Sequence, residues 1–364
     1  MRTLVLAPEL FTTDSGIPRV LRTYVRAFVE LAGPPGRVSF VTLNDASYAS
    51  RDLPGVTESA LRSWHTCAAR KGAFVRSALR AASHHDLIFC GHLAQAPVAW
   101  LASRRGARKP FVVLVHGIEG WHRLGPITRA ALRRAAGIWC VSGFTREQLL
   151  AHNPLPSERV HVLPSGLDPS FAPREQLTNA PRRPLILAVS RLSSEDRYKG
   201  VDHLIQALPA VRQAVPDARL QIVGRGSDRD RLYHLAGENA VRSHVTFSGF
   251  LSDHELREAL VNASVFALPS AGEGFGLVYA EALATGTPCI AADQGGAREI
   301  LNDETGLFVP HGDVAALSRA LVVALQRNWS RPVLQERARL FSYSAFRDRL
   351  RRQLESLSFT RASS

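Results

Sequence analysis

A glycine-rich turn holds the residues whose types and spacing are best suited to chemistry. In the stretch Pro269-Ser-Ala-Gly-Glu-Gly-Phe-Gly, Glu273 stands between glycines, and Glu281 follows eight residues later. Glycines let a backbone approach a ligand closely, and the free N–H groups at a helix start favour an anion. A strand over Val265–Leu268 and a helix over Phe275–Ala284 are predicted on either side of this turn. The pattern therefore indicates an anion site flanked by two carboxylates.

The separation of these carboxylates limits what they can do together. At roughly 1.5 Å per residue, Glu273 and Glu281 lie ~12 Å apart along a helix axis. A glycosidase pair needs about 5–9.5 Å, so that chemistry is excluded. The spacing suits one carboxylate at a sugar and the other at a ribose, with a diphosphate between them. The alternative is structural, with Glu273 beside a helix cap and Glu281 on the surface.

Two cations occur in a second segment that follows a predicted strand. Arg191 and Lys199 flank a polar loop between the strand Pro184–Val189 and the helix Gly200–Ala214. In a doubly wound sheet such a loop lies at the carboxyl edge, where ligands bind. Two cations there would neutralise a diphosphate and stabilise the charge that builds as it leaves. Alone, such a pair is also typical of a solvated surface.

The elements that position these residues alternate between strands and helices. Strands alternating with helices indicate parallel sheets wound in βαβ units, and about six strands in each half predict two Rossmann-like domains. The break is a Pro-rich polar stretch over residues 168–184, which divides the chain into domains 1–172 and 173–340. The other predicted strands are Thr3–Ala7, Val38–Leu43, Asp86–Cys90, Phe111–His116, Gly137–Ser142, Val160–Leu163, Arg219–Val223, His244–Ser248, Pro288–Ala291 and Gly306–Val309.

Charge is the most unusual property of the composition. The 364 residues include 45 Lys and Arg against 32 Asp and Glu, a formal net charge of +13. Residues 1–180 carry 22 basic and 12 acidic residues, so most of the excess lies in the first half. A basic amphipathic segment, Leu61–Arg80, has no acidic residue and is typical either of a membrane-surface helix or of a solvated helix face. No nucleic-acid recognition module accompanies the charge, so nucleic acid is not expected as a partner.

Other sequence features exclude several classes of protein. No apolar run is long enough for a membrane-spanning helix. The four cysteines are far apart in the sequence, which argues against a zinc site and favours a reducing, cytoplasmic compartment. No Asp-x-Asp stands in a suitable loop, so neither a metal nor another cofactor is expected.

The two chemical segments together resemble the retaining GT-B glycosyltransferases of glycosyltransferase family 4. The resemblance rests on Glu-Gly-Phe-Gly-Leu-Val-x-x-Glu-Ala-x-Ala-x-Gly-x-Pro from Glu273 and on Arg191-Leu-Ser with Arg197-Tyr-Lys-Gly-Val-Asp. It extends over most of the chain and is sharpest over residues 185–310. It implies an α/β fold of two doubly wound Rossmann-like domains facing a central cleft. It also implies that a C-terminal helix, about 341–360, packs back on the first domain.

The resemblance assigns roles to residues in the second domain. Glu273 would contact hydroxyls of the donor sugar, Glu281 would hold the ribose, and Arg191 and Lys199 would bind the diphosphate. The remaining donor contacts would come from amides at the sugar and phosphate and from the position that holds the base; they are Gly274, Phe275, Gly276, Leu277, Phe250 and Leu251.

The first domain would contribute the acceptor side. Ser15 and Gly16 follow the first strand and could present amides to phosphate, although the family has two glycines there. In the resemblance, His116 is a polar residue near the reacting sugar; a histidine at a strand end can also be simply hydrogen-bonded. Glu119 and Trp121 are further candidates for the acceptor site.

These expectations combine into one function. The chain should transfer a hexose, with mannose from GDP-mannose favoured, to a glycan or lipid-diphosphate-linked saccharide with retention of configuration and without a metal. The basic first domain favours an anionic membrane surface at the cytoplasmic face of the plasma membrane. The alternatives are a UDP-sugar-dependent transferase and a nucleotide-sugar-binding protein without turnover.

Overall fold

The computed structural model describes residues 1–13, 15–49, 52–173 and 183–362. It divides into two compact units: Met1–Gly166 with Tyr343–Ser364, and Leu167–Ser342. The boundary between the two units follows Gly166, whereas the sequence placed it after residue 172. Leu167 donates its N–H to the Phe341 carbonyl at 2.8 Å, and Arg257 donates to the Ser170 carbonyl at 3.2 Å, so this stretch belongs to the second unit. Of the linker expected over 168–184, residues 174–182 lie outside the described part.

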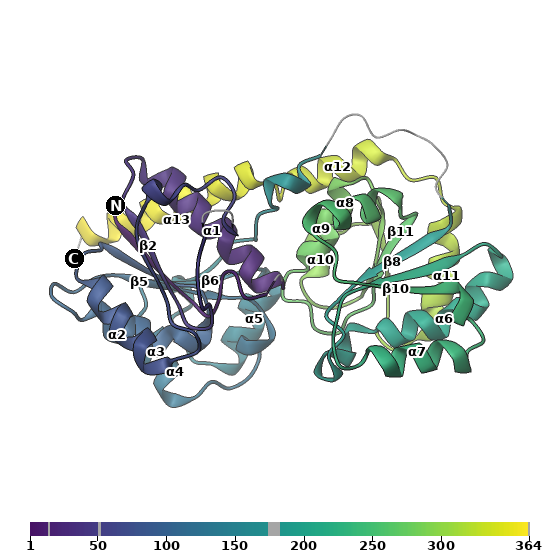
Figure 1. Ribbon diagram of the computed structural model, residues 1–364, viewed down its shortest axis with the longest axis horizontal. Coiled ribbons are helices and arrows are strands. Elements are labelled where there is room, and N and C mark those ends of the chain that lie inside the picture. The colour runs from purple at the N-terminus through teal and green to yellow at the C-terminus, as the bar shows by residue number, and fades with distance from the viewer. Residues whose placement is uncertain (14, 50–51, 174–182, 363–364) are drawn as a thin grey trace. The chain divides into compact units, whose positions relative to one another are not determined.

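The first unit is built on a parallel sheet of seven strands in the order β3-β2-β1-β4-β5-β6-β7 (Figure 1). Its strands are β1 (Thr3–Ala7), β2 (Val38–Thr42), β3 (Leu61–Thr66), β4 (Leu87–Cys90), β5 (Phe111–Val115), β6 (Gly137–Cys140) and β7 (Val160–Val162). Every residue of β1, β2, β4, β5 and β6 is buried, because helices cover both faces of the sheet. Six strands were expected here, and β3 is the additional one.

The second unit holds a parallel sheet of six strands in the order β10-β9-β8-β11-β12-β13. Its strands are β8 (Leu185–Val189), β9 (Arg219–Val223), β10 (Val245–Gly249), β11 (Val265–Leu268), β12 (Cys289–Ala292) and β13 (Gly306–Val309). In both sheets the strand order reverses beside the first strand of the unit, which is the arrangement of a Rossmann fold.

Helices flank each sheet. In the first unit they are α1 (Gly16–Ala32), α2 (Lys71–Ala82), α3 (Ala96–Ser103), α4 (Pro126–Leu132), α5 (Gly143–His152) and α13 (Tyr343–Ala362). In the second they are α6 (Val201–Ala214), α7 (Arg229–Glu238), α8 (Asp253–Asn262), α9 (Leu277–Ala284), α10 (Ala297–Ile300), α11 (Val314–Gln326) and α12 (Arg331–Arg339). No helix among the described residues is both long enough and apolar enough to cross a membrane.

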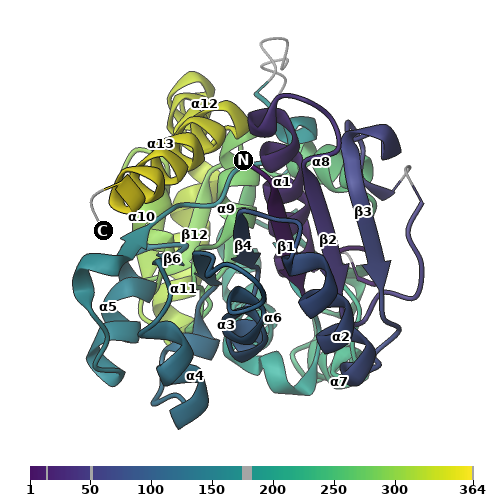
Figure 2. The same ribbon diagram turned by 90° about the vertical axis from the view of Figure 1, so that its left-hand side faces the viewer.

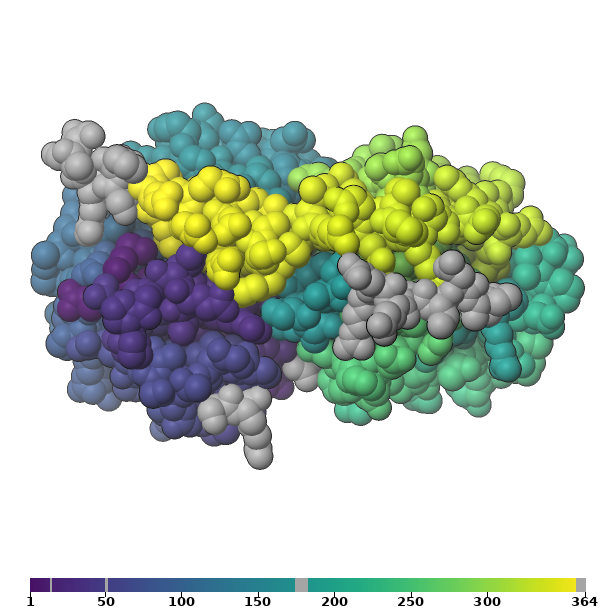
Figure 3. All heavy atoms as spheres, turned by 90° about the horizontal axis from the view of Figure 1, so that it is seen from above, coloured from purple at the N-terminus to yellow at the C-terminus, as the bar shows by residue number. Residues whose placement is uncertain are grey.

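The C-terminal helix α13 belongs to the first unit, where it lies against α1 (Figures 1 and 3). Phe346 is fully buried and its ring meets Tyr24 of α1 edge-on at 4.8 Å. Arg347 pairs with Glu30 at 3.3 Å, and the guanidinium of Arg26 lies 5.0 Å from the Tyr343 ring. The helix is thus held by an aromatic anchor with polar contacts around it.

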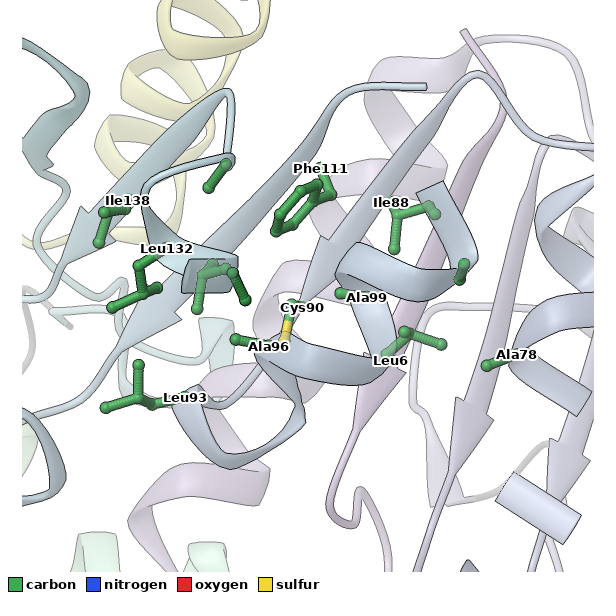
Figure 4. Packing of buried hydrophobic residues seen from close by; sticks show 14 of the residues in the cluster. Leu6, Ala78, Ile88, Cys90, Leu93, Ala96, Ala99, Phe111, Leu132 and Ile138 are labelled. Atoms are coloured by element: carbon green, nitrogen blue, oxygen red, sulfur yellow. The ribbon is translucent and has the colours of Figure 1, made fainter. Parts of the chain in front are cut away.

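The opposite face of the first sheet is covered by α2, α3 and α4, which lie side by side (Figure 2). Their small and apolar residues, such as Ala78, Ala99 and Leu132, pack on the sheet (Figure 4). The exposed basic residues of this region lie in the segments that flank α3 and α4; they are Arg104, Arg105, Arg108, Arg123, Arg133 and Arg134.

The segment Leu61–Arg80, expected to be one amphipathic element, is a strand, a turn and the start of a helix. Leu61 is buried in β3 and Phe74 is buried in the core under α2, while Arg62, Arg76 and Arg80 are exposed. The apolar side of this segment is already used by the core of its own unit. The segment is therefore not a single amphipathic helix, and its Leu61 and Phe74 are not available to a membrane surface.

Acid should destabilise the first unit through His85. Its Nδ1 donates to the Ala81 carbonyl at 2.7 Å and its Nε2 accepts from Ser39 at 2.9 Å, so the ring is held neutral. Burial lowers the pKa of His85 below its ordinary value of 6.5. The unfolded chain therefore binds the extra proton first, and stability is lost as pH falls below about 6.5. Between pH 7.5 and 5, the urea midpoint of His85→Gln should decline less steeply than that of the native protein. The control His84→Gln, at an exposed neighbouring position, should decline as the native protein does. Equal declines in both variants would contradict the role of His85.

Candidate functional site

The second unit places its candidate residues where the strand order of its sheet reverses. β8 and β11 are neighbours, and the chain leaves them towards opposite edges of the sheet. The loops after these two strands carry Lys199 and Glu273 respectively. A crevice at the carboxyl ends of such strands is the usual ligand position in open α/β sheets.

Lys199 and Glu273 form an ion pair at this point. The Lys199 ammonium donates to Glu273 Oε1 at 2.5 Å, and the two side chains are 20% and 11% exposed. Burial alone would lower the pKa of Lys199, but the charge of Glu273 and the proximity of Tyr198 outweigh it and raise the pKa above its ordinary value. Lys199 is thus a fixed cation at neutral pH. The two residues that the sequence placed in separate segments are brought together by the fold.

Backbone contacts hold the loop that carries Glu273. Gly296 donates its N–H to the Glu273 carbonyl at 2.8 Å, and Ala271 donates to the Tyr198 carbonyl at 2.8 Å. A Cβ on Gly296 would lie 2.4 Å from the Gly274 carbonyl oxygen. The loop is therefore clamped between the segment before Lys199 and the turn after β12. Neither Gly295 nor Gly296 was singled out from the sequence, because their importance depends on this close approach.

A methyl group at Gly296 should displace the Glu273 loop. Gly296 has φ −69°, which alanine adopts freely, so Gly296→Ala tests space and not backbone strain. We expect turnover to fall by about a hundredfold, since small misplacements of reacting groups are costly. The protein should remain folded, with a loss of about 1–3 kcal/mol typical of overpacking.

The matched control is Gly237→Ala in α7, where an added Cβ would meet nothing within 4 Å. It should leave the rate unchanged and slightly stabilise the fold. The measurements are the initial rate of transfer and the thermal unfolding midpoint of both variants. A native rate in Gly296→Ala would show that displacing the Glu273 loop does not affect the reaction.

Arg191 is oriented by a residue that the sequence did not single out. Its guanidinium donates twice to Asp196, at 2.6 and 3.0 Å, and these hydrogen bonds raise the pKa of Arg191. The Asp196 carboxylate is 4% exposed, whereas the Arg191 side chain is 65% exposed. Asp196 therefore anchors an outward-facing cation. Its position in the loop between Arg191 and Lys199 was the signal available in the sequence.

The helix start differs from the prediction. α9 begins at Leu277 and not at Phe275; Gly276 precedes it with φ +87°. Phe275 is buried and meets the Phe341 ring at 5.5 Å, so Phe275 and Gly276 belong to the turn and not to the helix. Gly274 lies in the same turn. Glu281, in the second turn of α9, is fully buried, which contradicts the alternative that it is a surface residue.

Phe250 and Leu251 follow β10 at the same edge of the sheet. The Phe250 ring is 45% exposed, and the guanidinium of Arg225, from the turn after β9, lies 5.5 Å from its centroid. Gly224 supports this turn: its φ is +141°, and a Cβ there would lie 1.8 Å from the Ser190 carbonyl oxygen. A flat apolar ring beside a planar cation could stack on a nucleobase. Arg225 is a further candidate that was not singled out from the sequence.

In the first unit, Ser15 and Gly16 lie at the start of α1, directly after β1. Ser15 precedes the helix, and its hydroxyl lies 3.1 Å from that of Thr13. Space around Gly16 is open, since a Cβ would meet nothing within 4 Å. The preceding loop is held by the buried Asp45, which accepts hydrogen bonds of 2.7–3.0 Å from three backbone N–H groups and a hydroxyl of residues 10–12. Asp45 follows β2, and only the pairing of β2 with β1 reveals its role.

His116 lies directly after β5, with Glu119 close to it. The Gly91 carbonyl can only accept, so His116 Nε2 carries the proton of their 2.8 Å hydrogen bond. Burial lowers the pKa of His116, although the Glu119 charge opposes this, and the ring is neutral with Nδ1 available as an acceptor. Glu119 accepts the His116 N–H at 2.6 Å. His92, not identified from the sequence, stacks on His116 at 6.0 Å.

Trp121 lies in the turn after Glu119 and meets Phe144 of α5 edge-on at 5.1 Å. Its ring is partly buried. Among the described residues, no group of three or more His, Cys, Asp or Glu side chains could hold a metal ion.

Comparison with known proteins identifies the family. The family model described as Glycosyltransferase Family 4 matches residues 15–171, and that described as Glycosyl transferases group 1 matches residues 171–341. The GDP-mannose-dependent alpha-(1-6)-phosphatidylinositol monomannoside mannosyltransferase of Mycolicibacterium smegmatis is 38% identical over 66% of this chain and 68% of its own. The chain belongs to glycosyltransferase family 4. Both domain models and this relative support the resemblance carried by the Glu273 and Arg191 segments.

A second relative and a solved structure extend the comparison. The GDP-mannose-dependent monoacylated alpha-(1-6)-phosphatidylinositol monomannoside mannosyltransferase of Corynebacterium glutamicum is 30% identical over 87% of this chain and 88% of its own. The crystal structure of Anabaena HepE in complex with UDP and glucose aligns with a TM-score of 0.79 at 20% identity, covering 98% of this chain and 100% of that one. This family 4 glycosyltransferase therefore consists of two Rossmann-like α/β domains of the GT-B type.

Proposed function

We propose that this glycosyltransferase moves mannose from GDP-mannose to a lipid-linked saccharide, with retention of configuration and without a metal. The observation that carries the proposal is the Lys199–Glu273 ion pair at the reversal point of the second sheet. The two mannosyltransferase relatives support the donor, and their phosphatidylinositol mannoside acceptors support a phosphoinositol lipid within the broader class of lipid-linked saccharides.

In the proposed reaction, the bond between the sugar C1 and the diphosphate oxygen breaks and its electron pair leaves with the phosphate. Lys199, Arg191 and the N–H groups at the start of α9 would offset that charge. The acceptor hydroxyl oxygen bonds to C1 on the same face, and its proton passes to the departing phosphate oxygen. Glu273 would hold donor hydroxyls, and Glu281 the ribose.

Neighbouring positions would complete the donor and acceptor sites. Phe250, Leu251 and Arg225 would contact the base. In the first unit, neutral His116 would accept a hydroxyl hydrogen bond through Nδ1, and the amides after Ser15 would face phosphate. Because the acceptor is a lipid, the protein would work as a peripheral protein on the cytoplasmic face of the plasma membrane.

The test compares donors on the same enzyme. Purified protein is given GDP-mannose or UDP-glucose with phosphatidylinositol monomannoside in detergent micelles, with and without EDTA, and the product linkage is determined by NMR. Transfer from GDP-mannose, insensitive to EDTA and giving an α-linked product, is expected. Transfer only from UDP-glucose would reassign the donor, and an inverted linkage would overturn retention.

A binding measurement separates an enzyme from a binding protein without turnover. At about one hundred times its dissociation constant, GDP should stabilise the fold by ~2.7 kcal/mol. Stabilisation by GDP without transfer to any saccharide lipid would favour the binding protein. The absence of any shift with GDP, UDP, ADP or dTDP would contradict a nucleotide site altogether.

A further inference from the structure

A basic surface of the first unit is formed by α3, α4 and the segments that flank them. The α3–α4 surface is defined here as the exposed side chains of residues 100–109 and 123–134. These two stretches contain eight Lys and Arg and no Asp or Glu. Within the described part of the chain, none of these eight cations forms an ion pair with a carboxylate. The charge of this surface is therefore uncompensated by the protein itself.

An aromatic residue joins the two helices of this surface. Trp100 of α3 is half-buried against the core, and two guanidinium groups lie near its ring centroid, that of Arg104 at 5.0 Å and that of Arg134, beyond α4, at 4.8 Å. Tryptophan is enriched at the headgroup level of membranes, and arginine binds phosphate oxygens through its planar fork. This combination is suited to a layer of phosphate headgroups more than to a single small anion.

Two large apolar side chains protrude from the same surface. Leu101 of α3 is 49% exposed and Ile127 of α4 is 65% exposed. The opposite sides of these helices, including Ala99 and Leu132, are buried in the core (Figure 4). Leu101 and Ile127 are therefore surplus to the packing of the unit. Basic residues with protruding apolar ones are the pattern of an interfacial surface.

We propose that the α3–α4 surface is the face by which this chain docks on an anionic lipid bilayer. The inference rests on the proposed function in one respect, namely that a lipid acceptor requires the protein to meet a membrane. It differs from the sequence interpretation, which placed membrane contact on Leu61–Arg80. Docking involves Arg and Lys at lipid phosphates, with Leu101 and Ile127 entering the boundary between headgroups and acyl chains.

Charge reversal tests the electrostatic part. Arg105, Arg108 and Arg123 are exposed, and Arg105→Glu/Arg108→Glu/Arg123→Glu removes no side-chain contact that holds the fold. Arg219→Glu/Arg319→Glu/Arg327→Glu changes the net charge equally in the second unit. Binding is measured by co-sedimentation with phosphatidylcholine vesicles and with phosphatidylcholine–phosphatidylglycerol vesicles. Since each surface cation contributes about fivefold to partitioning, the first variant should bind anionic vesicles at least about a hundredfold more weakly than the control variant.

A separate variant tests the contribution of the exposed apolar residues to vesicle binding. Leu101→Ser/Ile127→Ser should weaken vesicle binding about tenfold and leave its dependence on anionic lipid, whereas Val323→Ser, on α11, should bind as the native protein does. Equal binding of native protein to neutral and anionic vesicles would overturn the proposal, as would native binding by the charge-reversed variant. Binding of native protein to RNA or DNA at physiological salt without vesicle binding would also overturn it.

Transfer in detergent micelles separates this inference from the proposed function. The charge-reversed variant should retain native transfer to an acceptor in neutral detergent, and lose it only when the acceptor is in anionic vesicles. If native protein binds vesicles but transfers no sugar, the proposed function fails and the docking surface stands. If transfer in vesicles survives charge reversal, the docking surface fails and the proposed function stands.

Discussion

Replacing Lys199 with methionine is expected to lower the rate of transfer by about 10²–10³-fold, the effect typical of removing one group that stabilises developing charge. Lys199 is the cation held closest to Glu273, with their atoms 2.5 Å apart in a largely buried setting. Methionine keeps an unbranched apolar side chain that is one atom shorter, and it removes the ammonium with its charge and its hydrogen-bond donors. The same change leaves a buried carboxylate without its partner, so a loss of about 3–5 kcal/mol in stability should accompany it.

The double variant Lys199→Met/Glu273→Gln separates these two effects. Without the unpaired carboxylate, stability should return towards the native value while transfer stays low. Glu195→Gln is the matched control, because Glu195 is an exposed carboxylate in the same loop as Lys199. The measurements are initial rates at saturating donor and urea midpoints for each variant. A double variant that transfers at the native rate would show that the pair is structural and has no part in the reaction.

Removing the Phe346 ring should strongly destabilise the first unit. Phe346 is fully buried, stacks edge-on with Tyr24 at 4.8 Å and lies so close to Gly166 that a Cβ there would be 2.6 Å from its own Cβ. Phe346→Ala should cost about 3–5 kcal/mol, the usual range for a buried aromatic residue replaced by alanine. The cost arises because the ring fills a space that rigid aromatic neighbours cannot close.

The readout is a urea denaturation curve for Phe346→Ala beside Arg352→Ala, an exposed position on the same helix. The control should differ from the native protein by no more than about 0.5 kcal/mol. Hydrogen exchange adds a local measure, because α13 amides should lose protection before those of β4 and β5. Native protection of α13 in Phe346→Ala would mean that polar contacts such as Arg347–Glu30 hold the helix by themselves.

Strands and helices were predictable where local signals agree with the tertiary environment. β11 is an apolar run bounded by turn residues, and α8 begins with Ser252 and Glu255, whose side chains satisfy each other's backbone N–H groups. β3 was missed because it lies at the edge of its sheet, where alternating exposure leaves no apolar run to find. Its basic residues and the buried Phe74 downstream suggested one amphipathic segment, whereas the chain forms a strand and then a separate helix.

The sequence by itself determined the two Rossmann-like units, the turn carrying Glu273 and the loop carrying Arg191 and Lys199, because each depends on local periodicity and glycine spacing. Only the tertiary structure decided that Lys199 meets Glu273, that Asp196 orients Arg191, and that Gly296 supports the loop backbone. Lys199 and Glu273 lie in loops that follow different strands, and the close approach of Gly296 depends on the absence of a side chain, so neither leaves a local pattern. Asp196 shares a loop with Arg191, but only the fold of that loop shows that their side chains meet. The excess of positive charge in the first half is a property of the composition. That exposed cations gather in the segments flanking α3 and α4 depends on how these two helices pack on the sheet, which only the tertiary structure shows.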